Sequence, residues 1–339
     1  MNDQPITLSR RESLKLIALA TTATALAPTA ALANLLKSQD TILPWTQISP
    51  GFHALVDLNT GGNALIHATK DAVLLIDTKF PYLAGAMLKD ANSLSIADQP
   101  PLTLINTHHH NDHTAGNALV LPHAKNSYAH SNAIPRIQSQ LGTAQRAAKS
   151  APDQAEKYIN TPALNNLAKQ AADASDNWTK DDITPANPVN GQANKIVSGE
   201  TAITLHHFGP GHTDNDLVVH FENDNVIHTG DLVFSGLHPF FDPSAAGSTL
   251  GWLLALNQSY NLCDKDTKVI PGHGEPGDRS IIQKQMDYLT KLFTNIQTEI
   301  TKGTPKEEIA KMQWDFMDGL GFESIRERAI NAVYDELSE

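Results

Sequence analysis

The sequence has a single cysteine, Cys263, among its 339 residues, so no disulfide can form within the chain. It contains no G-x-S-x-G nucleophile elbow and no glycine-rich P-loop, so neither a serine nucleophile nor a phosphate-binding loop is predicted. Basic residues are also scarce, because 25 Lys and Arg stand against 37 Asp and Glu, for a net charge of -12. This balance argues against nucleic-acid binding and disfavours anionic membrane surfaces. We interpret the acidity as a contribution to solubility.

Residues 1–33 differ in character from the rest of the chain. Arg10 and Arg11 precede a modestly apolar stretch at residues 16–27, and a small-x-small tripeptide, Ala-Leu-Ala, ends at Ala33. This arrangement resembles a twin-arginine export signal that is removed after Ala33. A membrane anchor is the alternative, but the apolar run is rich in threonine and shorter than the roughly 20 residues of a membrane span. A disordered basic tail is a weaker alternative. We therefore expect a periplasmic or otherwise exported protein, delivered by the twin-arginine export machinery, with no membrane segment in its mature form.

The rest of the chain shows an α/β pattern of short apolar runs separated by turn residues. Strands are predicted at residues 52–58, 63–69, 72–78, 102–107, 195–208, 217–231 and 267–273, and helices at 82–94 and 249–262. Such alternation predicts an α/β protein with two β-rich halves.

Two segments of the chain are predicted to be mainly helical. Residues 133–178 are rich in Ala, Gln, Lys and Asn, and their helical spacing favours a helical insertion or lid over a flexible linker. The chain after Gly277 is helical to its end, with Gly303 and Pro305 between two helices. We therefore predict a domain at residues 40–277 that carries the insertion, and a C-terminal helical extension at residues 278–339.

The stretch THHHNDHTAGN follows a predicted strand and is dense in metal-ligand chemistry. His108 and His110 are two residues apart, so at a strand end their side chains would point to one face and that of His109 to the other. Asp112 and His113 follow where the chain must turn. Zinc and iron both accept imidazole nitrogen and carboxylate oxygen, so we predict a site for one or two metal ions here.

Three later segments each place a glycine and then a potential ligand after an apolar run. They are GPGHTDND with His212, HTGDLVF with Asp231 and IPGHGEP with His273. Glycine permits a sharp turn that presents the next side chain at a sheet edge. Each segment alone is a weak signal, whereas the occurrence of all three in this order is a strong one.

Together the four motifs resemble those of the metallo-β-lactamase fold superfamily, over roughly residues 51–277. The resemblance implies an α/β fold, a four-layer αβ/βα sandwich, here with a helical insertion and C-terminal helices. It also implies a dinuclear metal site at the edge where the strands end. Carried over residue by residue, the first metal would be held by His108, His110 and His212, the second by Asp112, His113 and His273, and both by a bridging Asp231.

The resemblance also narrows the chemistry. A bridging Asp, as at Asp231, is typical of glyoxalase II, lactonases and related hydrolases, whereas true β-lactamases commonly carry another residue there. Two cations lower the pKa of a shared water from about 15.7 towards neutrality, and the hydroxide then attacks a carbonyl carbon, with Asp112 helping to orient it. We therefore expect an exported dinuclear hydrolase of a small ester, thioester, lactone or amide. Two divalent ions are expected, zinc first, with iron or manganese as alternatives.

Two other functions stay open at this point. Sulfur dioxygenases of the same superfamily use a single iron with overlapping ligands, and a non-catalytic metal-binding periplasmic protein would need the same residues. The helices after Gly277 resemble those of uncharacterised bacterial members. They show no clear basic cluster for the carboxylates of glutathione, so glyoxalase II itself is not favoured.

Two further features are of interest near the predicted centre. Asp77 ends an early strand, and we expect it to hydrogen-bond to a ligand or to the loop backbone. The segment at residues 237–248 follows the strand of Asp231 and carries His238, Phe240 and Asp242. It is predicted either to shape the substrate pocket or to be an ordinary hydrophobic plug.

Overall fold

The chain is described by a computed structural model at residues 41–95, 97 and 99–338. The predicted export signal at residues 1–33 and the predicted start of the domain at residue 40 lie outside the described residues. Among the helices that are described, none combines the length and the apolar character needed to cross a membrane.

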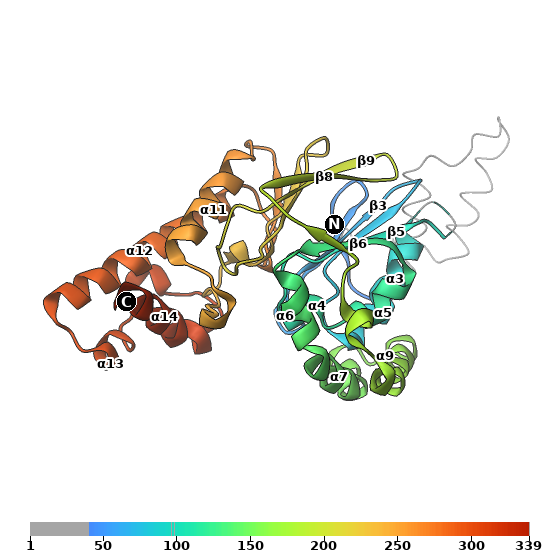
Figure 1. Ribbon diagram of the computed structural model, residues 1–339, viewed down its shortest axis with the longest axis horizontal. Coiled ribbons are helices and arrows are strands. Elements are labelled where there is room, and N and C mark those ends of the chain that lie inside the picture. The colour runs from blue at the N-terminus through green and yellow to red at the C-terminus, as the bar shows by residue number, and fades with distance from the viewer. Residues whose placement is uncertain (1–40, 96, 98, 339) are drawn as a thin grey trace, which may run out of the picture. The chain divides into compact units, whose positions relative to one another are not determined.

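Two main β-sheets form the centre of the fold (Figure 1). The first has seven strands in chain order, antiparallel from β1 to β4 and parallel from β4 to β7. The second has five strands in the order β13-β11-β10-β9-β8, and β12 and β14 form a separate parallel pair. The strands are β1 (Thr46–Ser49), β2 (Phe52–Leu55), β3 (Ala64–Ala68), β4 (Val73–Ile76), β5 (Leu102–Ile105), β6 (Ala124–His130), β7 (Asn187–Val189), β8 (Ala193–Ser198), β9 (Thr201–His206), β10 (Val218–Phe221), β11 (Val226–His228), β12 (Phe234–Ser235), β13 (Lys268–Ile270) and β14 (His273–Gly274).

The two main sheets pack face to face because their central strands are apolar on both sides. In β4, Leu74 and Ile76 belong to the core between the sheets, whereas Leu75 belongs to the core that the first sheet shares with helices. In β10, Val219 packs between the sheets and Val218 packs with the helices outside the second sheet. Neighbouring side chains of a strand point to opposite faces, so each sheet is covered on both faces.

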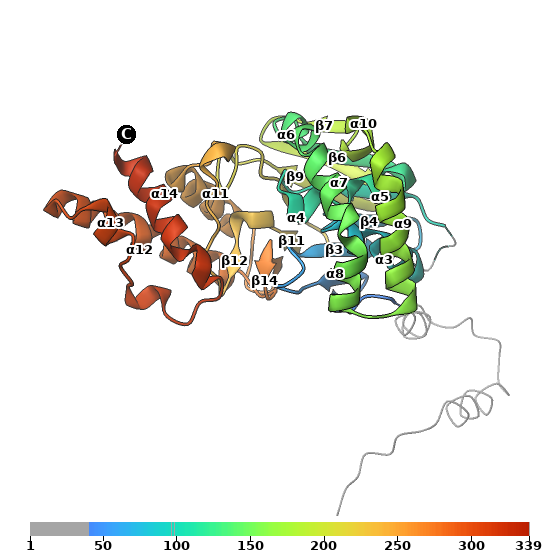
Figure 2. The same cartoon turned by 90° about the horizontal axis from the view of Figure 1, so that it is seen from below.

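Helices cover the outer face of each sheet (Figures 1 and 2). Leu83, Met87 and Leu164 of α3 and α9 pack on the first sheet, and Trp252 and Leu289 of α11 and α12 pack on the second. This arrangement is the predicted four-layer sandwich. The helices are α3 (Pro81–Leu94), α4 (Asn111–Thr114), α5 (Asn117–Val120), η1 (Leu121–His123), α6 (Ala133–Ser139), α7 (Leu141–Lys149), α8 (Ala151–Tyr158), α9 (Pro162–Ala174), η2 (Ser175–Asn177), α10 (Lys180–Ile183), η3 (Gly230–Leu232), η4 (Pro243–Ala245), α11 (Thr249–Asn261), α12 (Ser280–Lys302), α13 (Lys306–Ile309), η5 (Asp315–Met317), η6 (Glu323–Ile325) and α14 (Arg326–Ser338).

The segment at residues 133–178, predicted as a helical insertion or lid, forms α6 to α9 and η2. Many of its buried residues are alanines, including Ala144, Ala148, Ala155 and Ala168, so helices with few large apolar side chains still pack closely. The segment packs on α3 in the outer helical layer. None of its residues lines the cavity described below, so its packing favours a structural layer over a lid.

Asp90 of α3 holds the start of the described chain. The carboxylate is 1% exposed and accepts hydrogen bonds from the backbone N–H of Ile42 (2.7 Å), the backbone N–H of Leu43 (2.9 Å) and the indole N–H of Trp45 (3.0 Å). The Asp90→Ala substitution leaves these three donors without their acceptor. We expect it to lower the free energy of unfolding by about 2–4 kcal/mol, measured by urea denaturation.

Lys89→Ala is the matched control, because Lys89 is the exposed neighbour of Asp90 on the same helix. That variant should change the free energy of unfolding by less than about 0.5 kcal/mol. Equal losses in the two variants would contradict the role given to the Asp90 carboxylate.

Candidate metal centre

The structure brings the seven predicted ligand residues together in two adjoining groups. The ligand atoms of one group all lie within 4.8 Å of one another, and the same holds for the other group. The first group comprises His108, His110, His212 and Asp231, and the second comprises Asp112, His113 and His273. Each group contains the three residues that the resemblance assigns to one metal, and Asp231, assigned to both metals, falls in the first group. The role of each residue as a ligand stays a prediction.

The local backbone differs from the prediction for His108 and His110. Strand β5 ends at Ile105, so His108 lies in the following loop and His110 is the N-cap of α4. The two side chains meet because the chain turns into this short helix, and strand alternation does not bring them together. Asp112 and His113 follow in α4 itself.

Asp231 lies between the two groups. Its Oδ1 atom is 3.0 Å from Nε2 of His113, and its Oδ2 atom is 3.4 Å from Nε2 of His273. The same Oδ2 atom is 3.7 Å from Nε2 of His108 and 3.6 Å from Nε2 of His212. One carboxylate therefore faces imidazole nitrogens of both groups, as a bridging ligand would.

The buried polar atoms of the cluster fit a metal centre. Nε2 of His113 and Oδ1 of Asp231 are buried and face each other at 3.0 Å, but neither makes a hydrogen bond of acceptable geometry with any described residue. Burial opposes a charge on His113, but the carboxylates of Asp231, Asp112 and Asp77 outweigh it and raise its pKa well above the usual value. A metal cation competes with protons for such nitrogens and satisfies the same carboxylates. The residues present therefore suit a bound cation.

Asp77 orients two of the histidines, and it makes both kinds of contact predicted for it. Its Oδ2 atom accepts a hydrogen bond from Nδ1 of His113 (2.7 Å), and its Oδ1 atom accepts one from the backbone N–H of Thr107 (2.8 Å). The Thr107 hydroxyl donates to Asp77 (2.7 Å) and lies 3.1 Å from Nδ1 of His108. These contacts leave the Nε2 atoms of both histidines free to face the cluster.

Asp242 orients a third histidine from the loop at residues 237–248. Its Oδ2 atom accepts a hydrogen bond from Nε2 of His110 (3.1 Å), and this bond is the main cause that lowers the pKa of Asp242. Nδ1 of His110 then faces the cluster, 3.0 Å from Nε2 of both His108 and His212. His109, Asp242 and His110 also qualify as a possible ligand group. Because His110 is shared with the first group, we interpret Asp242 as its supporting partner.

The glycines beside the ligands are required for two different reasons. Gly230 has a φ of 53°, the left-handed conformation that glycine adopts readily, and it precedes Asp231 as predicted. Gly272 has no positive φ, but a Cβ atom there would lie 2.0 Å from Oδ1 of Asp231. The glycine before His273 is therefore needed for the close approach of Asp231, and the predicted sharp turn is not its reason.

Lys79 is a supporting residue that the sequence analysis missed. It is fully buried, and its ammonium group donates to the carbonyl oxygens of Gly61 and Gly62. Gly62 in turn lies against the ring of His113. A Cβ atom at position 62 would be only 2.0 Å from that ring. Burial lowers the pKa of Lys79 to about 8. No sequence signal identifies it, since lysines are almost never fully buried.

A cavity of about 590 Å³ opens on the cluster. His110, Asp112, Asp231 and His273 face it, together with Asn111. Six large apolar side chains and two small residues complete the lining: Leu58, Phe80, Phe234, Phe240, Phe322, Ile325, Gly61 and Ser324.

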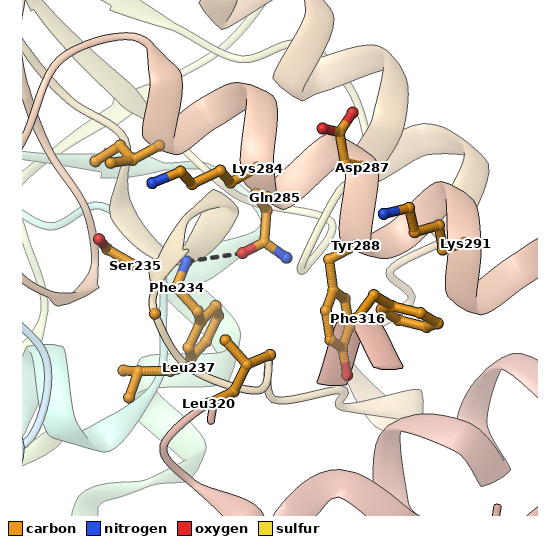
Figure 3. Close-up of a pocket in the computed structure, with 12 residues that line it drawn as sticks. Phe234, Ser235, Leu237, Lys284, Gln285, Asp287, Tyr288, Lys291, Phe316 and Leu320 are labelled. Carbon is orange, nitrogen blue, oxygen red and sulfur yellow. Dashed lines mark hydrogen bonds between the residues drawn. The ribbon is translucent and has the colours of Figure 1, made fainter. Parts of the chain in front are cut away.

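Phe234 also lines a second cavity, of about 310 Å³ (Figure 3). Gln285 of α12 accepts a hydrogen bond from the backbone N–H of Phe234 (3.0 Å). The Phe234 ring stacks on that of His273, with centroids 5.0 Å apart and an angle of 9° between the planes. Helix α12 therefore fixes the orientation of one predicted ligand through Phe234.

Solved structures that resemble this chain share its fold. The stereoselective inverting sec-alkylsulfatase Pisa1 from Pseudomonas sp. aligns with a TM-score of 0.60 and 16% identity, over 93% of this chain and 53% of the alkylsulfatase. A metallo-beta-lactamase from Pontibacter korlensis aligns with a TM-score of 0.50 and 19% identity, over 73% of this chain and 99% of that one. The chain thus spans about half the length of the alkylsulfatase, and at these identities the likeness concerns the fold alone.

Sequence comparison gives the family. No curated protein matches the chain significantly. The model of the metallo-beta-lactamase superfamily matches residues 59–293, a span that includes all seven predicted ligand residues and confirms the resemblance seen in the motifs. With its sandwich fold and its cluster of histidines and aspartates, the chain belongs to the metallo-beta-lactamase superfamily.

Proposed function

We propose that this protein is a metal-dependent hydrolase with a dinuclear centre. The observation that supports it most is the position of Asp231, whose two carboxylate oxygens lie 3.0–3.7 Å from histidine nitrogens of both groups. In this proposal His108, His110 and His212 hold one divalent cation. Asp112, His113 and His273 hold the other, and Asp231 contacts both.

The residues of the chain supply position and charge for the reaction. When bound, two such cations supply an activated water and polarise a carbonyl oxygen. Asp112 faces the cavity, is 28% exposed, and has its Oδ2 atom 3.2 Å from Nε2 of His273. Its carboxylate is thus placed to accept a hydrogen bond from a water at the centre and to orient it. Asp77 and Asp242 hold three of the histidines in the orientation that binding requires.

The proposed substrate is a small ester, thioester, lactone or amide, which fits a cavity of about 590 Å³. Zinc is the first candidate for the metal, with iron or manganese as alternatives. We also propose export through the twin-arginine machinery after removal of residues 1–33, a periplasmic or otherwise exported location, and no nucleic-acid partner. The domain at residues 40–277 and the extension at residues 278–339 belong to the same proposal.

Metal analysis of the purified protein tests the dinuclear centre. We expect about two divalent ions per chain, with loss of ester or lactone hydrolysis after chelation and recovery when zinc is restored. A content of about one iron per chain, with oxygen uptake on persulfides, would instead establish the sulfur dioxygenase alternative. Absence of turnover of esters, lactones and cephalosporins by the zinc-, iron- and manganese-loaded forms would favour the non-catalytic role.

The Asp231→Ala substitution tests the proposed bridging position. Without this carboxylate the two groups lose their common ligand, so we expect loss of bound metal and a fall in kcat of at least about a thousandfold. Metal content and hydrolysis should be measured on the same sample, with circular dichroism to show that the fold is kept. A variant with both metals and the full rate would show that the bridging assignment is wrong.

The Asp77→Asn substitution tests the support of the ligands. Asp77 has a φ of 60°, a conformation that Asn tolerates well, so the variant removes the carboxylate with little change to the backbone. We expect metal affinity to fall about 10–100-fold in competition with a chromogenic chelator. Asp71→Asn is the control, because Asp71 lies at the opposite end of strand β4. Equal metal affinity in the two variants would refute the supporting role of Asp77.

A further inference from the structure

The C-terminal segment of the chain forms one wall of the cavity at the metal centre. Phe322, Ser324 and Ile325 line it: Phe322 is the N-cap of the short helix η6, and the other two lie within η6, directly before α14. The Phe322 ring lies 5.7 Å from that of His273, at an angle of 69°. Residues after the predicted catalytic domain therefore reach the place where a substrate would lie.

The backbone of this wall is held in a conformation that phenylalanine rarely adopts. Phe322 has a φ of 60°, which is unfavourable for a bulky side chain. Such conformations persist only where the surroundings impose them, and they are concentrated at ligand sites. Here Gly321 donates its N–H to the carbonyl oxygen of Gly236 (3.0 Å) and accepts from the N–H of His238 (2.9 Å).

The side chains on either side of the wall complete its attachment. His238 is fully buried, with Nδ1 2.8 Å from the hydroxyl of Tyr288 and Nε2 3.1 Å from a carboxylate oxygen of Glu323. The other carboxylate oxygen of Glu323 lies 2.8 Å from Nε of Arg326. The position of the Phe322 ring is thus set by contacts on both of its sides.

The charge of the cavity wall is as informative as its shape. Among the residues that the structure describes, 41–338 without 96 and 98, no lysine or arginine lines the cavity. Three cationic side chains near the wall have partners of their own and do not line the cavity. Lys79 is buried on the carbonyl groups of Gly61 and Gly62, Arg326 pairs with Glu323, and Arg328 lies over the Phe240 ring (4.2 Å) and donates to the carbonyl of Phe241 (2.8 Å).

From these observations we infer that the cavity selects uncharged esters or lactones with an apolar acyl chain. Phe322 is the residue that determines this specificity, with Phe240 and Ile325 beside it. A carboxylate or sulfate on the substrate would find no lysine or arginine on the wall, whereas an alkyl chain would be buried against six apolar side chains. The inference rests on the proposed hydrolase function, because it names the substrate class of the same centre.

The first experiment compares kcat/KM for three 4-nitrophenyl esters: the acetate, the octanoate and the negatively charged hemisuccinate. The metal-loaded wild-type protein should favour the octanoate over the hemisuccinate by at least about tenfold. Phe322→Ala should lower kcat/KM for the octanoate about tenfold and change that for the acetate less than about threefold.

Phe316→Ala is the matched control. Phe316 belongs to the same C-terminal region, but it lies beside Tyr288 at the second cavity and does not line the reaction cavity (Figure 3). This variant should keep the ratio of octanoate to acetate. Ser324→Lys is an independent variant at an exposed position of the wall, and it should raise kcat/KM for the hemisuccinate relative to the octanoate. An unchanged ester preference in both Phe322→Ala and Ser324→Lys would overturn the inference.

Binding of the uncharged fluorescent dye N-phenyl-1-naphthylamine gives a readout that does not depend on turnover. Phe322→Ala should weaken binding of the dye about tenfold, and Phe316→Ala should leave it unchanged. If no ester is hydrolysed but dye binding depends on Phe322, the hydrolase function fails and the apolar wall stands. If the octanoate is hydrolysed but neither hydrolysis nor dye binding responds to Phe322→Ala, the wall inference fails and the hydrolase function stands.

Discussion

A carboxylate that is 3% exposed and surrounded by histidine nitrogens, as Asp231 is, has to be compensated by positive charge at the same place. Much of the molecule serves that requirement. The segments that follow β5 and β11 lie against each other, since a Cβ atom at Gly230 would be 2.9 Å from Thr107, so Asp231 and the loop of His108 meet although the chain separates them widely. Gly272 is small enough to let Asp231 approach. The carboxylates of Asp231, Asp77 and Asp112 together raise the pKa of His113.

How far the sequence predicts this centre depends on the range of each interaction. His108, His110, Asp112 and His113 lie within six residues, and the later predicted ligands each follow a glycine, so local pattern was sufficient to single out the residues that the structure groups together. The apolar runs predicted an α/β protein with two β-rich halves, and the resemblance of the motifs to the superfamily implied the four-layer sandwich. By contrast, β1 and β7 were missed, since TQIS and NPV have no apolar alternation and are ordered by their neighbours in the sheet.

Several of the contacts that support the predicted ligands could not be predicted from the sequence. Lys79 is buried on two backbone carbonyls, and backbone acceptors leave no trace in a sequence. Asp242 meets His110 from 132 residues away, and Gln285 meets Phe234 from 51 residues away. The left-handed φ of Phe322 could not be expected either, because propensity argues against it. Each of these features depends on tertiary contacts that residue spacing does not encode.

The loop at residues 237–248 combines the two roles that the sequence predicted as alternatives, a hydrophobic plug and a wall of the pocket. Phe241 packs against Trp252 in the core, with ring centroids 5.2 Å apart, as a hydrophobic plug would. Phe240 lines the cavity and Asp242 holds His110, as a pocket-forming loop would. His238, at the start of the loop, reaches Glu323 beside Phe322. One loop therefore connects a predicted metal ligand to the cavity wall formed by Phe322.

The residues that would hold metal and the residues that line the far wall of the cavity belong to different parts of the chain. The histidines and aspartates that would hold metal all lie within the span matched by the superfamily, residues 59–293. Phe322 and Ile325 lie beyond it and reach the cavity only through the packing of the C-terminal helices. A change in that segment can therefore alter which substrate fits without touching a ligand, which is how one fold comes to serve many reactions. In this protein the C-terminal helices pack on the second sheet, and the short turn η6 between them carries residues that line the cavity at the predicted metal centre.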